Sequence, residues 1–152
     1  MRKAITAVLL TIILTTGFMI YVDRNYLFTP FSELDRDITV RPWYKFRKPL
    51  ELEISLIEQG WKSKRIQDEV EIIRILEDLE QLEYSGTEII QKGRHFVITL
   101  RQPDTKDHAG LLLQFDGYED GDIRINNGKA KRLSNDFRNK IKGILDDIER
   151  VT

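Results

Sequence analysis

A run of nineteen consecutive uncharged residues near the N-terminus, 4–22, constrains this chain more than any other feature. As an α-helix rising about 1.5 Å per residue, the run would be about 28 Å long, which matches the hydrocarbon core of a bilayer at about 30 Å. Its four threonines are compatible with a membrane, because a helical threonine can hydrogen-bond to the preceding turn. We therefore expect residues 1–23 to form an N-terminal transmembrane helix.

A cleaved signal peptide is the alternative, and it would have a shorter apolar region followed by small residues at the cleavage site. The only such segment is Thr15-Thr16-Gly17, and the chain stays apolar beyond it, so a retained anchor is favoured. Arg2 and Lys3 precede the apolar run. Basic residues favour the cytoplasmic side, so we expect a single-pass protein of the cell membrane with a cytoplasmic N-terminus and an extracytoplasmic C-terminal domain.

Residues 24–49 are predicted to form an extended linker. They contain Pro30, Pro42 and Pro49 and lack sustained periodicity, and a proline keeps the residue before it extended. Regular patterning begins at residue 50, so residues 50–152 are predicted to form one domain. A domain of this length can bury a hydrophobic core without a disulfide or a metal ion. Cysteine is absent, which excludes a disulfide framework, a thiolate metal site and a lipoprotein anchor.

The first part of this domain has the pattern of a hairpin followed by a helix. Residues 50–56 alternate between apolar and polar, as a half-buried strand does, and 61–66 would form the second arm. Asp68 and Glu71 have the spacing of a helix N-cap pair. Apolar residues then recur at helical steps as far as Leu82, and Gly86 would end the helix.

The second part predicts further strands and one more helix. The strands are expected at 87–91, 95–101, 111–115, 123–125 and 129–133, and Asn126-Asn127-Gly128 suits a hairpin turn between the last two. Ser134 can cap a helix whose apolar residues fall on one stripe. The order predicts an α+β fold, in which the transmembrane helix is followed by an antiparallel sheet with two helices packed on one face.

Residues 116–127 partly match a twelve-residue calcium loop. Asp116, Asp120 and Gly121 stand at the required first, fifth and sixth positions, but Tyr118 and Asn127 replace ligands at the third and twelfth. Aspartate and glycine are also what a turn between strands prefers. The turn interpretation is favoured, and no metal site is predicted.

An aromatic and basic segment, 41–48, is a candidate membrane-surface contact. Aromatic rings favour the membrane interface, and each cation near anionic headgroups adds about 1 kcal/mol. The alternatives are a solvated tether whose aromatics pack on the domain's edge and, less favoured, a nucleic-acid contact. The residues of this segment assigned to membrane contact are Arg41, Trp43, Tyr44, Lys45, Phe46, Arg47 and Lys48.

Charge is segregated along the chain, whose formal net charge is −1. Eight acids and Arg74 lie within 68–88, whereas seven basic residues and Asp136 lie within 124–142. These segments can steer a charged partner, pair with each other across two packed helices, or be solvated. From Pro49 onward sixteen basic and twenty-one acidic residues give a net charge of −5, which argues against nucleic-acid binding.

No pattern predicts catalysis. His95 begins a predicted strand and His108 lies in a polar loop, and a zinc site would need cysteine or clearer spacing. No serine stands in a nucleophile elbow, and no glycine-rich phosphate loop follows a strand. We therefore expect a non-enzymatic protein without a cofactor.

The pattern as a whole resembles the small YhfM-like domains of membrane-anchored or lipoprotein-type proteins of Gram-positive bacteria. The resemblance covers the anchor, a strand such as 52–56, the helix capped by Asp68, two alternating strands and a hairpin ending at Leu133-Ser134 before a helix. A lipid-modified cysteine is replaced here by a retained helix. The resemblance implies an extracytoplasmic location and this fold, and it carries no activity.

The function expected from these patterns is that of a binding or interaction module on a membrane anchor. The expected partners are the membrane and another envelope or membrane protein, without nucleic acid, and the patterns name no small-molecule ligand. The alternative is a structural accessory subunit of a membrane complex that acts through its transmembrane helix.

Overall fold

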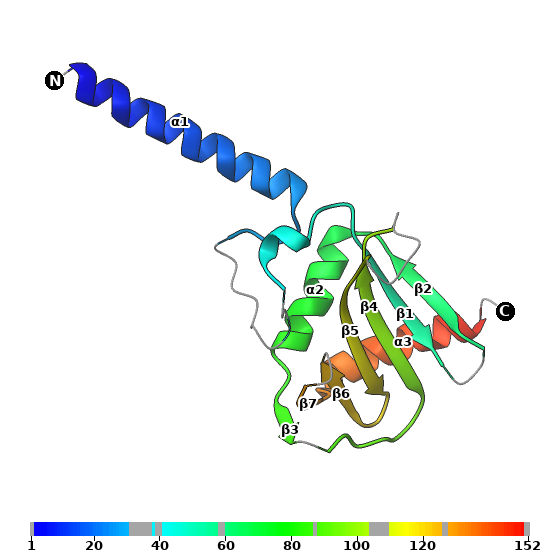
Figure 1. The fold of residues 1–152 in the computed structure, drawn as a ribbon. Helices are drawn as coiled ribbons and strands as arrows, with labels where there is room; N and C mark the ends of the chain where they lie inside the picture. Colours follow the sequence, from blue (N-terminus) through cyan, green and yellow to red (C-terminus); the bar gives the residue numbers. More distant parts are fainter. Residues whose placement is uncertain are drawn as a thin grey trace.

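The computed structural model describes residues 2–30, 38, 41–57, 60–86, 88–103, 110–125 and 128–150. Helix α1 (Arg2–Asn25) extends away from the rest of the molecule, which forms a sheet covered by two helices (Figure 1). In α1 the hydroxyls of Thr11 and Thr15 donate to the carbonyl oxygens of Ala7 and Thr11, at 2.9 and 2.8 Å. These threonines therefore satisfy their hydroxyls within the helix, as predicted.

Within the described residues seven strands form one sheet in the order β2-β1-β4-β5-β6-β7-β3, and every pair is antiparallel. The strands are β1 (Glu51–Leu56), β2 (Lys62–Ile66), β3 (Tyr84–Gly86), β4 (His95–Arg101), β5 (Leu111–Tyr118), β6 (Asp122–Ile125) and β7 (Ala130–Arg132). The predicted hairpin of β1 and β2 is confirmed. The turn residues 58–59, 126 and 127 lie outside the described residues.

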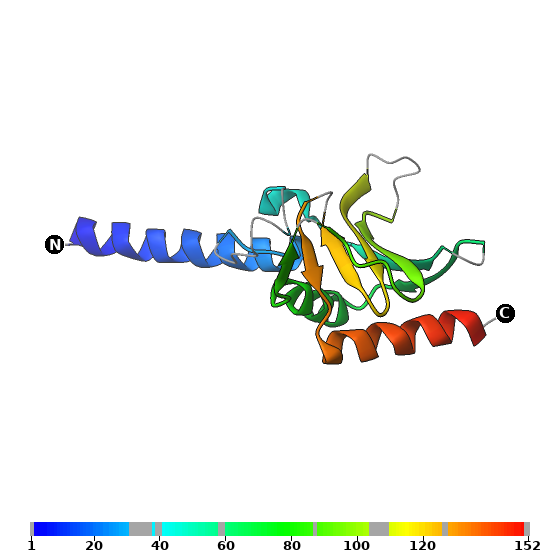
Figure 2. The ribbon, with the colours of Figure 1, turned by 90° about the horizontal axis from the view of Figure 1, so that it is seen from below.

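Helices α2 (Glu69–Glu80) and α3 (Asn135–Arg150) lie on the same face of the sheet (Figures 1 and 2). Both predicted caps are confirmed, because Asp68 accepts from the backbone N–H of Glu71 at 2.8 Å and Ser134 from that of Phe137 at 3.2 Å. The α+β fold with two helices on one face of an antiparallel sheet is therefore the one that the sequence predicted.

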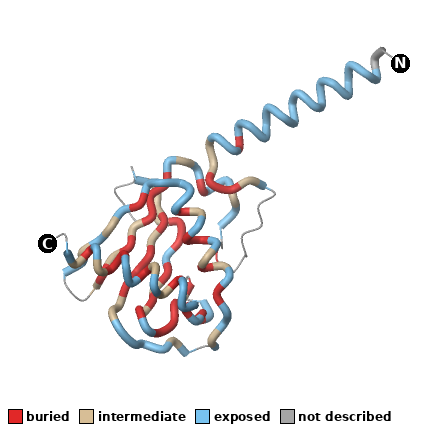
Figure 3. Tube along the Cα trace, turned by 180° about the vertical axis from the view of Figure 1, so that it is seen from behind, coloured by how far each residue is buried: buried red, intermediate tan, exposed pale blue. Residues whose placement is uncertain are grey.

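The core lies between the sheet and these helices, where the buried residues gather (Figure 3). Leu52, Ile54 and Leu56 of β1 point toward the helices and are essentially inaccessible to solvent. Their neighbours Glu51, Glu53 and Ser55 therefore point to the opposite face, because side chains alternate along a strand. The other face of the sheet is the polar one.

Two predictions about elements were wrong. Helix α2 ends at Glu80, and Tyr84-Ser85-Gly86 forms the edge strand β3 against β7 instead of the helix terminus. Residues 88–91 form no strand, although the backbone N–H of Asp122 donates to the Ile90 carbonyl at 3.1 Å and its carboxylate accepts from the Ile90 N–H at 3.1 Å. The Asp122 carboxylate thus takes the place of a backbone acceptor that a regular strand pair would supply to Ile90.

Candidate membrane-proximal site and open sheet face

The chain that leaves α1 turns directly into the domain. The backbone N–H of Leu27 donates to the Phe46 carbonyl, and that of Lys48 donates to the Asn25 carbonyl, both at 2.8 Å. Leu27, Phe28 and Phe46 belong to the buried core, and the rings of Phe28 and Phe46 meet edge to face with centroids 4.9 Å apart. We call these two short segments, 25–28 and 45–48, the joint.

The joint differs from the extended linker predicted over 24–49. Arg24 and Asn25 are the last residues of α1, residues 43–45 form the 3₁₀ helix η1 (Trp43–Lys45), and Ile38 is fully buried. The prolines do prevent a long helix, but Leu27, Phe28 and Phe46 bury apolar side chains that an extended tether would leave in water. The described part of the segment packs on the domain.

A chain of aromatic rings begins near the end of α1. Tyr21 contacts Tyr26, Tyr26 contacts Trp43, and Trp43 contacts Tyr44, with ring centroids 6.3, 5.0 and 6.0 Å apart, all edge to face. Tyr21 and Tyr44 are about half exposed. Tyrosine and tryptophan are enriched where a membrane meets water, because one part of each ring system is apolar and the other can hydrogen-bond.

The predicted contact segment 41–48 divides into two groups. Phe46 has no exposed surface and Lys48 is largely covered, so these two side chains face the domain. The others face outward at least in part, and the ammonium of Lys45 lies 5.9 Å from the Tyr44 ring centre. The outward group consists of Arg41, Trp43, Tyr44, Lys45 and Arg47. These residues and the end of α1 are brought together by the joint.

Lys48 links α1 to α2. Its ammonium donates to the backbone carbonyl of Asp23 at 2.8 Å and lies 2.5 Å from the carboxylate of Glu69. Glu69 stands in the first turn of α2, where a negative charge is favoured by the helix dipole. One cation therefore connects the last turn of α1 with the first turn of α2.

A cavity of about 490 Å³ lies beside this connection. Its apolar wall is formed by Leu27, Leu50 and Ile72 together with two prolines, and its polar groups are Lys48, Gln67 and Glu69. The cavity thus combines an apolar wall with one positive and one negative group. Such a mixture suits a ligand that is itself amphiphilic.

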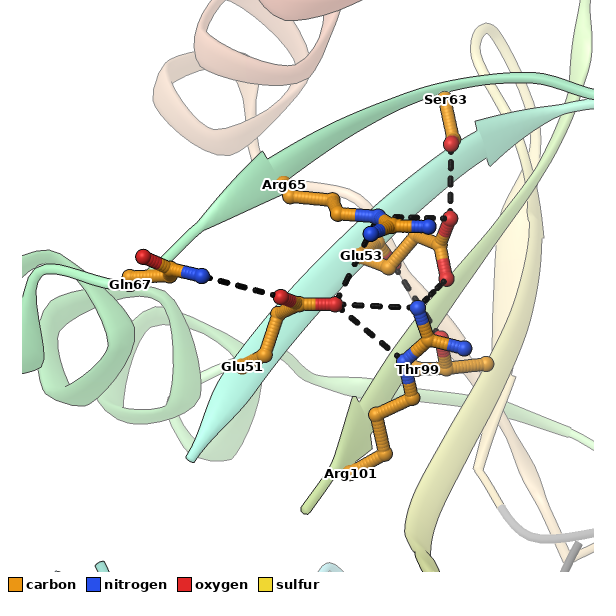
Figure 4. Close-up of polar contacts among 7 residues, drawn as sticks. All are labelled: Glu51, Glu53, Ser63, Arg65, Gln67, Thr99 and Arg101. Atoms are coloured by element: carbon orange, nitrogen blue, oxygen red, sulfur yellow. Dashed lines mark hydrogen bonds and ion pairs between the residues drawn. The ribbon is translucent and has the colours of Figure 1, made fainter. Parts of the chain in front are cut away.

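Gln67 connects this cavity to a network of charged side chains on the open face of the sheet (Figure 4). Its amide donates to Glu51 at 3.1 Å. The guanidinium of Arg101 lies 3.0 Å from both Glu51 and Glu53, and Arg65 approaches the same two carboxylates at 3.5 and 3.7 Å. The network therefore spans β1, β2 and β4.

The Glu51 carboxylate is charged although its side chain is only 4 % exposed. Burial alone would raise the pKa of Glu51, but the hydrogen bonds from Gln67 and Arg101 and the charge of Arg65 hold this pKa below its ordinary value. Its cationic partners are more exposed than Glu51 is. The open face thus presents guanidinium groups held in place by carboxylates beneath them.

His95, Asp116 and Tyr118 form a second polar group on the open face. The Nε2 atom of His95 lies 2.5 Å from Asp116, and its ring stacks on Tyr118 with centroids 4.6 Å apart. Asp116 therefore lies within β5 and faces a neighbouring strand. The turn interpretation of the 116–127 segment is supported, since Gly121 donates to the Tyr118 carbonyl at 3.0 Å in the connection from β5 to β6.

Among the residues that the structure describes, no three side chains of the His, Asp and Glu types come together as metal ligands. Asn127, the last position of the predicted calcium loop, and His108 lie outside the described residues.

Arg94 ties the β5–β6 turn to α3 at the other end of the molecule. Its guanidinium lies 2.6 Å from Glu119, 2.8 Å from Asp146 and 3.1 Å from Glu149. The hydrogen bond from Arg94 lowers the pKa of Glu119 below its ordinary value, although burial acts in the opposite direction. The same hydrogen bond raises the pKa of Arg94. This cluster stabilises the fold.

The segregated charges partly face each other, which was one of the alternatives. Lys140 of α3 lies 2.8 Å from Asp78 of α2, and the buried ammonium of Lys131 donates to the carbonyls of Leu79 and Glu80 at the end of α2. In these contacts basic residues from the second half of the domain compensate the negative charge of α2 and the negative end of its dipole.

No family model matches this chain, and neither does any curated protein or solved structure in the searches.

Sequence reasoning did not find the network or the cavity. The paired residues are far apart in the chain, with fifty positions between Glu51 and Arg101 and twenty-five between Asp23 and Lys48. One signal was available, because the predicted hairpin places Glu51 and Glu53 on the same face as Arg65. The cavity left no such signal, since its lining comes from the joint, the residues just before β1 and α2, α2 itself and the segment after β4.

Proposed function

We propose that this chain is a single-pass protein of the bacterial cell membrane whose extracytoplasmic α+β domain is a non-enzymatic binding module. One observation carries the proposal. Among the described residues, Ala4–Asn25 is the one helix long and apolar enough to cross a membrane, and only 6 % of its apolar window is buried. A core helix of a soluble protein would be mostly buried, so this apolar surface needs another apolar environment.

The attachment of the helix favours a retained anchor over a cleaved signal peptide. Cleavage after Gly17 would leave Phe18, Met19 and Ile20, each about half exposed, at the start of a soluble chain. Val22 is buried, and Asp23 and Asn25 accept hydrogen bonds from Lys48. The end of the helix is therefore part of the domain's packing.

We assign partner binding to the open face of the sheet. The guanidinium groups of Arg65 and Arg101 are oriented before any partner arrives, which reduces the entropy cost of binding. Together with the carboxylates of Glu51 and Glu53 they give this face a mixed charge, which suits a protein surface that is also mixed in charge. The resemblance to YhfM-like domains remains a prediction that agrees with this location.

Topology is the first test. Reporters fused to the two ends of the full chain in intact bacteria should place the N-terminus in the cytoplasm and the C-terminus outside. Recovery of the full-length chain in the soluble fraction with its first residues intact would overturn the proposal. A cytoplasmic C-terminus in a membrane-bound chain would overturn the orientation alone.

Crosslinking tests the binding face. A photoreactive residue in place of Ser63, exposed on the open face, should capture a specific membrane or envelope protein in intact cells. The same residue in place of Asn139, exposed on α3, is the matched control. Equal capture from both positions would contradict binding by the open face.

A structural accessory subunit is the second candidate, because the apolar surface of α1 could itself contact another membrane protein. Exchange of residues 4–20 for an unrelated apolar sequence distinguishes the two functions. Residues 21–28 must be kept because Val22, Leu27 and Phe28 are buried. A binding module should keep its partner after the exchange, whereas an accessory subunit should lose it.

A further inference from the structure

We infer that the cavity beside the joint is a binding site for the headgroup of a zwitterionic phospholipid with a primary amine, of the phosphatidylethanolamine type. The inference rests on the proposed membrane anchor, because the cavity can bind a headgroup only if it lies at the level of the headgroups in the bilayer. It assigns a ligand to a surface distinct from the open sheet face.

The position of Lys48 sets the level of the cavity in the bilayer. The span Ala4–Asn25 has 22 residues, which corresponds to about 33 Å of helix. The hydrocarbon core is about 30 Å thick, and about 40–45 Å with the headgroup regions. The last turn of α1 therefore lies among the headgroups, and the Lys48 ammonium lies 2.8 Å from the Asp23 carbonyl in that turn.

The charges in the cavity select the headgroup. Lys48 can donate to a phosphate, and Glu69, whose side chain is 45 % exposed, can accept from an ammonium. A lipid that carries both a phosphate and an ammonium replaces the Lys48–Glu69 ion pair with two ion pairs. One joins Lys48 to the phosphate, and the other joins Glu69 to the ammonium. An anionic lipid without an amine would place its phosphate near Glu69 with no charge to compensate that carboxylate.

The lining of the cavity also argues against a choline headgroup. A quaternary ammonium has no N–H to donate and is bound in proteins by aromatic rings, whereas none of the described residues that line this cavity is aromatic. Leu27, Leu50 and Ile72 instead offer an apolar wall for the glycerol end of the lipid. The primary amine is thus the headgroup that fits best.

Lipid retention tests this inference. The full-length chain would be placed in nanodiscs of equal parts phosphatidylethanolamine, phosphatidylglycerol and phosphatidylcholine, extracted in mild detergent and examined by native mass spectrometry. We expect phosphatidylethanolamine to be retained about tenfold over the other two, the factor that one charge-assisted hydrogen bond produces. Equal retention, or a preference for either other lipid, would overturn the inference.

Glu69→Gln removes the carboxylate charge at nearly constant size and should abolish the preference. Glu71→Gln is the matched control, because Glu71 lies in the same turn of α2 but does not line the cavity. Unfolding temperatures of both variants report whether they fold. A Glu69→Gln chain that folds and keeps the preference would contradict the inference.

Two further measurements separate the sources of failure. Phosphoethanolamine has the same headgroup chemistry without a lipid, and it should displace the lipid only at far higher concentration. Displacement at equal concentration would make the soluble compound the ligand and overturn the lipid assignment. A soluble chain with an intact N-terminus would overturn the anchor itself, whereas a membrane-bound chain without lipid preference overturns this inference alone.

Discussion

Gly121 stands where the turn between β5 and β6 meets the segment before β4. A Cβ atom at this position would lie 1.9 Å from the Ile90 carbonyl oxygen and 3.1 Å from the Cβ of Tyr118. The same two segments are held by a hydrogen bond from the Asp120 N–H to the Lys92 carbonyl at 2.9 Å. The glycine is therefore required by a close approach of two backbones.

Gly121→Ala should lower the free energy of unfolding by about 3 kcal/mol, the upper range for overpacking, because Ile90 must move away. Gly143→Ala is the control. Gly143 lies in α3 with open space around it, and alanine there should raise stability by about 0.5–1 kcal/mol. Denaturant unfolding of the solubilised chain measures both changes. Equal effects of the same sign would contradict the close approach.

Arg94→Met should also destabilise the fold. The change would leave the Glu119 carboxylate, whose side chain is 8 % exposed, without its main partner, and we expect a loss of about 3 kcal/mol. The double variant Arg94→Met with Glu119→Gln should recover part of this loss, because it removes the unpaired charge. The same unfolding measurement applies. Equal stability of the single and double variants would show that the carboxylate is compensated in another way.

At the scale of residues, the sequence predicted the caps and the turn but not the reason for Gly121. Asp68 and Ser134 bond to backbone groups three positions away, so their roles follow from local spacing. Gly121 depends on Ile90, and Arg94 on Glu119 and α3. Such contacts depend on which segments the fold brings together, and one sequence does not specify that directly.

At the scale of elements, alternation and helical spacing predicted the longer strands and both domain helices. Strand β4 has the predicted bounds, and β5 extends the predicted strand to Tyr118. The failures are short elements. Strand β3 has three residues, too few for a pattern, and the joint consists of two short segments whose apolar side chains have no regular period.

The free energy of unfolding should fall in acid, because the carboxylates of Glu51 and Glu119 stabilise the fold only while they are charged. The pKa values of Glu51 and Glu119 in the folded chain lie below their ordinary value of 4.5. Their stabilisation is therefore fully present above pH 4.5 and is lost as the pH falls through the lower folded values.

Thermal unfolding from pH 7 to 3 tests this dependence. The unfolding temperature should change little above about pH 5 and fall below it. The variant Glu51→Gln with Glu119→Gln should be less stable at pH 7, and its deficit relative to the wild type should shrink as the pH falls below 4.5. A deficit that stays constant down to pH 3 would contradict the depressed pKa values.

For the whole molecule, the folded unit should begin within the end of α1. A chain that starts at residue 21 keeps Leu27, Phe28 and Phe46, whereas a chain that starts at residue 50 loses these core residues. Loss of a buried phenylalanine side chain alone costs about 3–5 kcal/mol. The shorter chain should therefore unfold at a markedly lower denaturant concentration. Equal midpoints for the two chains would restore the boundary that the sequence predicted at residue 50.

The bonds of Lys48 to Asp23 and Glu69 also bear on how the molecule would meet its surroundings. A domain on a loose tether can tumble, but one clamped to its span turns only when the span turns. With α1 in a bilayer, the sheet would keep a fixed tilt and a fixed distance from the membrane surface. The domain would then meet its partners by diffusion in the plane of the membrane. Only neighbours that carry a matching surface at that height could dock.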